Sequence, residues 1–416
     1  MAERIRVPEA GDLAARIRAR FTVRANRVGI ALPLSGPRSS IGERMRRALD
    51  AGRPAQGPEL VFEDTGGTPH GAAAAVEALV MEHQVVAIVG PVGDRESLAA
   101  AHRATELEVP LIVLADRPDL PSVSPWIFRR RFGLEAQVRS TVRYAADHLG
   151  LTRLAILYPT DSFGDRAAEI FWREVAAAGG SVTAAASYPE GADGEALDRA
   201  VRLLIGGEHA GARGDAFEVG QGKFKGYRPI VRFQGLFIAD YPAVARQLLR
   251  HLTYYDVAIR TSPTVPAVRK AVDTGRELVA VQILGTAAWN DPGFARGAPM
   301  EVQNAVFCDV FHREAPEPSV ASFVRRFHRA SGRPPSSVEA QARDAMAWVM
   351  QAWRSAARRG REGVRRALLS EHVAMPATGP ARIRPDGAAI LTPMFLTVSG
   401  AGIVRRERLD SVSPNR

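Results

Sequence analysis

Three short segments of the sequence place charged or hydroxyl side chains beside glycine or proline, each directly after a short apolar run. They are Ser35 to Gly42, Gly90 to Ser97 and Leu114 to Leu120. The second runs into a helical pattern, whose first N–H groups suit an anion or a carboxylate. Asp94 and Ser97 have two readings here, as caps of that helix or as ligand contacts. The chemistry that these segments favour is the binding of a small polar molecule.

The third segment carries adjacent opposite charges, Asp116 and Arg117. An unpaired charge at a strand end beside a sheet is costly, so we expect this pair to have a purpose. Ligand binding is the purpose that the position suggests, because ligands of open α/β sheets bind just past the carboxyl ends of strands.

The sequence contains no recognisable catalytic motif. There is no Gly-x-Ser-x-Gly elbow, no P-loop and no Gly-x-Gly-x-x-Gly after the first apolar run. The nine histidines are scattered, without the spacing of a metal-binding helix face. We therefore expect a protein that is not an enzyme, with no catalytic residues, no metal and no cofactor.

Apolar runs alternate with helical patterns from Arg27 onward. This alternation predicts parallel sheets with helical crossovers, and its restart near residue 153 predicts two such sheets. The predicted strands are 28–33, 60–64, 85–89, 110–114, 126–130, 153–158, 181–187, 233–239, 279–284, 389–398 and 402–407. The predicted helices lie near 39–51, 70–83, 95–107, 135–149, 163–178, 194–205, 320–330 and 339–355.

The size and charge of the chain exclude some classes of protein. At 416 residues it exceeds the roughly 250–300 residues of a single core, so two domains are expected. The net charge is +10, nearly all of the basic residues are arginine, and acidic residues are interspersed throughout. No aromatic-rich basic strand of the kind that stacks bases is present, so we expect no nucleic-acid partner.

Three further features bear on location and partners. Residues 2–25 have apolar spacing that suggests an amphipathic helix, the linker to or end of an upstream region. Residues 206–228 form a glycine-rich insertion, read either as a mobile solvated loop or as a grip for an anion or a partner. Cys308 lies in an apolar run and is expected to be buried. No apolar stretch approaches roughly 18 residues, which fits a cytosolic chain or an exported one whose leader lies outside this sequence.

The order of these motifs resembles the type I periplasmic-binding fold, the superfamily of the Leu/Ile/Val-binding proteins. The matching pieces are Leu32 to Pro37 with Gly42, Phe62 to Thr65, Val86 to Pro91, Val109 to Val113, Ala155 to Tyr158 and Asp161 to Asp165. Within the superfamily, three segments look most like the penicillin-binding-protein activators (LppC/LpoA-like). They are Leu236 to Tyr241, Tyr254 to Asp256 and Leu284 to Asn290.

The resemblance implies an α/β fold of two Rossmann-like lobes with parallel sheets, joined by a three-stranded hinge and separated by a cleft. Residues 1–26 would precede the lobes, and the crossings would lie near 131–134, 308–314 and 376–382. The first lobe would comprise 27–132 and 315–377, and the second 135–308 and 382–416. One wall of the cleft would carry Ser39, Ser40, Gly93, Asp94, Ala115, Asp116 and Arg117. The other wall would carry Phe163, Tyr241, Thr286 and Trp289.

One departure from the amino-acid binders affects the expected ligand. Those proteins hold the ligand's ammonium with an acid of the second lobe, but residues 285–289 contain no carboxylate. A standard amino acid is therefore not expected; the cleft would bind a different polar molecule or none.

Two functions remain open. The first is a non-enzymatic regulator of peptidoglycan synthesis, in the periplasm or attached to the outer membrane by a lipid anchor or leader, with a cell-wall synthase as partner. The alternative is the substrate-binding receptor of an ABC importer for a small polar ligand. The sequence leaves the oligomeric state open.

Overall fold

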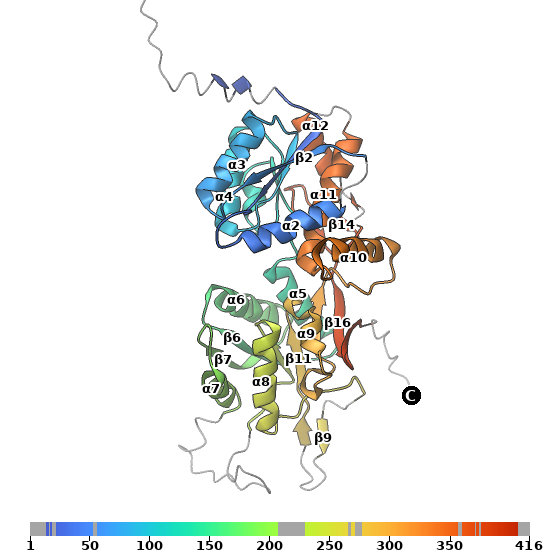
Figure 1. Ribbon diagram of the computed structural model, residues 1–416. Coiled ribbons are helices and arrows are strands. Elements are labelled where there is room, and N and C mark those ends of the chain that lie inside the picture. Colours follow the sequence, from blue (N-terminus) through green and yellow to red (C-terminus); the bar gives the residue numbers. More distant parts are fainter. Residues whose placement is uncertain are drawn as a thin grey trace, which may run out of the picture. The chain divides into compact units, whose positions relative to one another are not determined.

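The structure is a computed structural model. It describes residues 14–15, 17–18, 22–52, 56–206, 229–264, 268–270, 277–356, 360–370, 372–373 and 376–406. Contacts divide the chain into two compact units (Figure 1). Unit 1 comprises Met1–Gly133 and Val310–Thr392, and unit 2 comprises Leu134–Asp309 and Pro393–Arg416.

Unit 1 is built on a five-stranded parallel sheet of order β2-β1-β3-β4-β5. The strands are β1 (Arg27–Leu32), β2 (Glu59–Asp64), β3 (Ala87–Val89), β4 (Leu111–Val113) and β5 (Ile127–Arg129). Nearly all side chains of β1, β3 and β4 are buried, as expected for strands covered on both faces. A small antiparallel sheet adds β13 (His372–Val373), β14 (Ala381–Ile383) and β15 (Ala389–Leu391).

Two groups of helices accompany this sheet. The first pairs α3 (Pro69–Met81) with α4 (Asp94–Glu106). The second contains α2 (Ser39–Gly52), α10 (Pro318–Ser331), α11 (Ser337–Ser355) and α12 (Arg361–Leu368), with α11 in contact with both α2 and α12. A short 3₁₀ turn, η1 (Leu120–Val123), precedes β5. Gly29 of β1 permits close packing, since a Cβ there would lie 2.9 Å from the methyl groups of Leu79 of α3.

Unit 2 is built on a seven-stranded sheet of order β17-β16-β12-β11-β8-β6-β7, parallel except for its β16 and β17 edge. Its strands are β6 (Arg153–Pro159), β7 (Ser181–Tyr188), β8 (Gly235–Ile238), β11 (Gln282–Gly285), β12 (Val306–Asp309), β16 (Met394–Ser399) and β17 (Gly402–Arg405). A separate hairpin pairs β9 (Val268–Lys270) with β10 (Glu277–Val279).

The helices of unit 2 follow its strands in alternation. They are α5 (Leu134–Asp147), α6 (Ser162–Ala177), α7 (Gly194–Leu204), α8 (Pro242–Tyr254) and α9 (Pro292–Ala295), with the 3₁₀ turns η3 (Ala287–Trp289) and η4 (Met300–Val302). One core cluster draws on α7, α8 and α9, and another on α5 and α6. The predicted α/β class with parallel sheets is therefore confirmed.

The carboxyl-terminal part of the chain differs from the prediction. The single strand predicted at 389–398 is two strands, β15 in unit 1 and β16 in unit 2. The chain passes between the units at 392–393 rather than at 376–382, so residues 382–392 go with unit 1. The reason is pairing, because β15 bonds to β14 whereas β16 bonds to β12. Pro393, which has no N–H to donate, stands at the break.

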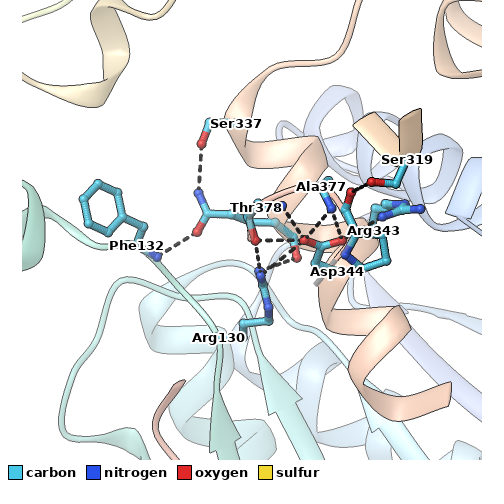
Figure 2. A network of polar contacts seen from close by, with 10 residues as sticks. Arg130, Phe132, Ser319, Ser337, Arg343, Asp344, Ala377 and Thr378 are labelled. Atoms are coloured by element: carbon cyan, nitrogen blue, oxygen red, sulfur yellow. Dashed lines mark hydrogen bonds and ion pairs between the residues drawn. The ribbon is translucent and has the colours of Figure 1, made fainter. Parts of the chain in front are cut away.

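A buried polar network joins three segments of unit 1 that are distant in sequence (Figure 2). Arg130, just after β5, donates to the Gln341 carbonyl of α11 at 3.0 Å and to the Thr378 hydroxyl. Phe132 donates its N–H to the Gln341 side chain at 2.7 Å. Asp344 of α11 accepts the N–H of Thr378 at 2.7 Å. The end of β5, α11 and the loop before β14 are therefore tied together.

Two predicted features lie largely outside the described residues. Of the helix expected at 2–25, residues 14–15, 17–18 and 22–25 are described; the first four are helical, whereas 22–25 are not. Of the insertion at 206–228, only Gly206 is described. Within the described ranges, no helix combines the length and the apolar character needed to span a bilayer.

Candidate functional site

The candidate site of unit 1 lies where three neighbouring parallel strands end. β1 pairs with β3 and β3 with β4, all parallel. The turns that follow these strands therefore leave the same edge of the sheet. These turns are residues 33–42, 90–97 and 114–120, the three segments that the sequence singled out.

The first turn is held by a carboxylate at the end of the neighbouring strand. Asp64 accepts the N–H groups of Leu34 at 2.8 Å, Ser35 at 3.1 Å and Gly66 at 2.8 Å. Burial raises the pKa of Asp64, but these hydrogen bonds outweigh it and leave the pKa below its usual value. The turn is thus fixed by a charged acceptor that the sequence reasoning did not identify.

Ser39 and Ser40 begin α2 directly after this turn. Ser39 is half-buried and Ser40 is exposed. Gly42 lets the helix start close to the end of β1, since a Cβ there would lie 1.9 Å from the carbonyl oxygen of Pro33. Both serines therefore lie close to the carboxyl end of β1, at the start of α2.

The second turn leads into α4, whose N-cap is Gly93. No side chain caps this end of the helix, so neither Asp94 nor Ser97 has the capping role that the sequence suggested. Asp94 is instead exposed in the first helical turn, and Ser97 is completely buried. The nearby ion pair of Arg38 with Glu96, 2.7 Å long, joins the first turn to the second. The sequence contains no clear signal for Glu96, because the capping box that places a glutamate three residues after an N-cap needs Ser or Thr at the cap, and this cap is Gly93.

The charges of the third turn have partners within unit 1. Asp116 pairs with Arg129 at 3.1 Å, and Arg117 with Asp119 at 3.0 Å. The hydrogen bond between Arg117 and Asp119 raises the pKa of Arg117 and lowers the pKa of Asp119. Both charges are therefore neutralised locally, which gives them a structural role that needs no ligand. Ala115 is fully buried, with its carbonyl 3.3 Å from Arg129 Nε.

Two aromatic side chains stand at strand ends of unit 2. Phe163 follows β6 and Tyr241 follows β8, and these strands are parallel neighbours. Their rings stack with centroids 6.2 Å apart and planes 25° apart. Tyr241 is 65% exposed, so this aromatic pair offers an accessible surface.

Thr286 and Trp289 follow β11, the neighbour of β8 in the sheet. Both are buried, and the Thr286 hydroxyl accepts the N–H of Ala288 at the start of η3. Trp289 packs on Phe294 and donates its indole N–H to the Asp240 carbonyl at 2.8 Å. In this structure, neither side chain lines a surface, contrary to their predicted role as wall residues.

Asp240 is a buried acid that the sequence reasoning did not identify. It accepts the Tyr188 hydroxyl at 2.7 Å and the N–H of Tyr241 at 2.6 Å. Burial raises the pKa of Asp240, although these two bonds oppose it. Burial and the neighbouring carboxylate also raise the pKa of Tyr188. Asp240 therefore fixes the backbone that carries Tyr241.

Cys308 is buried, as predicted. Burial raises the pKa of its thiol to about 12, which keeps it neutral. Among the described residues, no group of three or more His, Cys, Asp or Glu is arranged to hold a metal ion.

Comparisons with known proteins give a family match for part of the chain and similar solved structures for most of it. Residues 26–201 match the family described as periplasmic binding protein. No curated protein matches the chain. A putative branched-chain amino acid ABC transporter protein from Rhodospirillum rubrum has a similar structure, with a TM-score of 0.70 at 21% identity, covering 92% of this chain and 100% of that one.

Two further solved structures are similar over most of their length. The leucine binding protein LivK from Thermotoga maritima gives a TM-score of 0.62 at 19% identity, covering 92% of this chain and 97% of that one. A solute binding protein of an ABC transporter from Rhodopseudomonas palustris was solved in complex with 3,4-dihydroxybenzoic acid. It gives a TM-score of 0.63 at 18% identity, covering 90% of this chain and 94% of that one.

These likenesses show the fold, which is that of the type I periplasmic binding proteins. The matching family and the similar structures are binding proteins rather than enzymes. The finer resemblance to penicillin-binding-protein activators, with its synthase partner and outer-membrane attachment, receives no support from them.

Proposed function

We propose that the chain is the substrate-binding protein of an ABC importer and works in the periplasm. The observation that supports this most is the set of prearranged turns at the strand ends of unit 1. Asp64 fixes the first turn with hydrogen bonds from the N–H groups of Leu34 and Ser35, and α4 begins the second turn's helix without a side-chain cap. A site whose backbone is already ordered loses little freedom when a solute binds.

The ligands of similar proteins support a class of solute. Those with this fold include complexes with isoleucine, leucine and 3,4-dihydroxybenzoic acid. All are small organic acids, and a small polar organic solute is what we propose here. Ser39, Ser40, Gly93 and Asp94 are the proposed contacts of unit 1.

On unit 2 the proposed contacts are Phe163 and Tyr241. The remaining predicted residues would act as supports. Asp116 and Arg117 are held by ion pairs, Ala115 is buried beside Arg129, and Thr286 and Trp289 are buried within unit 2.

A thermal-shift screen against a broad collection of metabolites tests the proposal. A solute at 100 times its Kd stabilises the folded protein by about 2.7 kcal/mol, which raises Tm measurably. Asp94→Ala is expected to reduce the shift, because Asp94 is exposed in the first turn of α4. Glu195, also an exposed acid in the first turn of its helix, α7, supplies the control: Glu195→Ala is expected to leave the thermal shift unchanged. A screen without any shift would contradict the proposed function.

A further inference from the structure

Glu96 of α4 is a buried carboxylate that is only half satisfied. Its side chain is 2% exposed, and one oxygen, Oε1, accepts a hydrogen bond from Arg38 at 2.7 Å. The other oxygen, Oε2, has no hydrogen-bond partner among the described residues. Such a group is expensive to leave inside a protein, because each carboxylate oxygen can accept two hydrogen bonds. Glu96 therefore has capacity for a further donor.

The carboxylate lies in the turn that the proposed function uses. A Cβ built on Gly93 would fall 2.3 Å from Glu96 Oε1 and 2.6 Å from the Arg38 guanidinium, so both groups lie directly against this residue. The next residue along the helix, Ser97, is also completely buried and its hydroxyl has no partner in the described part of the chain. Near the start of α4, two buried oxygen atoms, Glu96 Oε2 and the Ser97 hydroxyl, can therefore each accept a further hydrogen bond.

The charges of this turn balance only while Arg38 is in place. Asp94 and Glu96 contribute two negative charges to the first turn of α4, and Arg95 of the same turn and Arg38 of the neighbouring turn contribute two positive charges. If Arg38 turns outward, a group with positive charge and N–H donors restores the balance.

Arg38 is a weakly held partner for so buried an acid. Its side chain is 57% exposed, and a single hydrogen bond joins it to Glu96. Water can hydrate the Arg38 side chain when it leaves, but it cannot hydrate the buried Glu96, and a buried carboxylate without its counter-charge is costly. Arg38 is therefore expected to turn outward only when another cation with N–H donors takes its place.

We propose that Glu96 is a specificity-determining residue that binds an N–H-bearing cation of the solute, a primary ammonium or a guanidinium, which takes the place of Arg38. This inference rests on the proposed function. The cation would then be bound by unit 1, since residues 285–289 of unit 2 contain no carboxylate.

Two substitutions in the ion pair distinguish this role from a structural one. Glu96→Gln keeps the shape but removes the charge, and solute binding is expected to weaken at least about 10-fold, the value of a hydrogen bond to a charged group. Arg38→Ala removes the competitor, so the solute is expected to bind at least as tightly as to the unmodified protein. If the pair only tied the two turns together, both variants would weaken binding alike, and that result would overturn the proposal.

Matched controls come from an exposed ion pair in the same unit. Glu43 and Arg46 of α2 pair at 2.8 Å. Glu43→Gln and Arg46→Ala are expected to leave the Kd unchanged. Thermal unfolding without solute checks that all four variants are folded.

The chemistry of the solute is tested with pairs that differ only in the N–H groups. The probes are γ-aminobutyrate and its trimethylammonium derivative, and ethanolamine and choline, added to the metabolite collection and measured by calorimetry. Solutes that bind are expected to carry N–H donors on a cation, and their trimethylated forms to bind at least about 10-fold more weakly. Binding confined to amine-free carboxylates would overturn this inference and leave the proposed function intact, whereas no binding by any solute would contradict the proposed function itself.

Discussion

Arg130 and Asp344 form an ion pair of 3.5 Å in which both side chains are completely buried. Burial lowers the pKa of Arg130 to about 10, with the Asp344 charge opposing it, so the guanidinium stays protonated at neutral pH. Asp344 is also held by Arg343 at 3.0 Å and by the N–H groups of Ala377 and Thr378 (Figure 2). The pair is therefore the centre of the network that joins β5 to α11.

Asp344→Ala is expected to destabilise unit 1 by about 3–5 kcal/mol, because it leaves the buried Arg130 without its counter-charge. Hydrogen exchange of the α11 amides measures this, since these amides report the opening of unit 1. Arg46→Ala, which breaks an exposed pair with Glu43 in the same unit, is expected to cost less than about 1 kcal/mol. Equal effects of the two substitutions would contradict the importance given to burial.

The architecture was predictable because buried parallel strands leave a simple trace in the sequence. Val28 to Leu32 form an uncharged apolar run, and β1 is buried along it. The alternation of these runs with helical patterns then predicted that the strands are parallel. The prediction was wrong at 389–398, because an apolar pattern shows that a segment is extended but not which strand it pairs with. The division at Thr392 and Pro393 depends on hydrogen bonds to β14 and β12.

The position of the candidate site was predictable, but its partners were not. Strand ends located the turns, whereas the pairing of Asp116 with Arg129 required knowledge of how β4 and β5 lie together. Asp64 and Asp240 escaped notice because their role is to accept backbone N–H groups, which carry no sequence signal. Arg117 with Asp119 is the exception, since residues two apart in a turn are within reach from sequence alone.

The stability of unit 1 is expected to fall in acid because of Glu339. Burial raises the pKa of this carboxyl, but hydrogen bonds from Arg44, Ser336 and Arg333 outweigh it and lower the pKa to about 2, from an ordinary value of 4.5. Since the folded pKa is the lower one, the stabilisation is complete above about pH 5 and is lost as the pH falls toward 2. Glu339→Gln should thus be less stable than the unmodified protein at pH 7, with a difference that shrinks below pH 4.5. Unfolding in urea at several pH values measures it, and a constant difference would count against the assignment.

Trp289 and Tyr241 are expected to respond differently to substitution. Tyr241→Ala removes the exposed ring of the aromatic pair and should weaken solute binding while leaving stability nearly unchanged. Trp289→Phe leaves the buried Asp240 carbonyl without its indole donor, which should cost about 1–3 kcal/mol of stability and affect Kd less. Calorimetric Kd values and urea unfolding compare the two. Larger loss of binding in Trp289→Phe than in Tyr241→Ala would restore the tryptophan as a direct contact.

Gly93→Ala is expected to disturb the Arg38 and Glu96 pair without unfolding α4. The added Cβ would lie 2.3 Å from Glu96 Oε1 and 2.6 Å from the Arg38 guanidinium, so both groups must move. Gly360, the N-cap of α12, is the matched control, because a Cβ there meets nothing within 4 Å. Both substitutions replace a glycine N-cap by a poorer one and lose similar capping energy, of a few tenths to about 1 kcal/mol. Any additional loss of stability or solute affinity in Gly93→Ala therefore reports the crowding of Glu96. Indistinguishable Tm and Kd values for the two variants would show that the ion pair can shift freely at this turn.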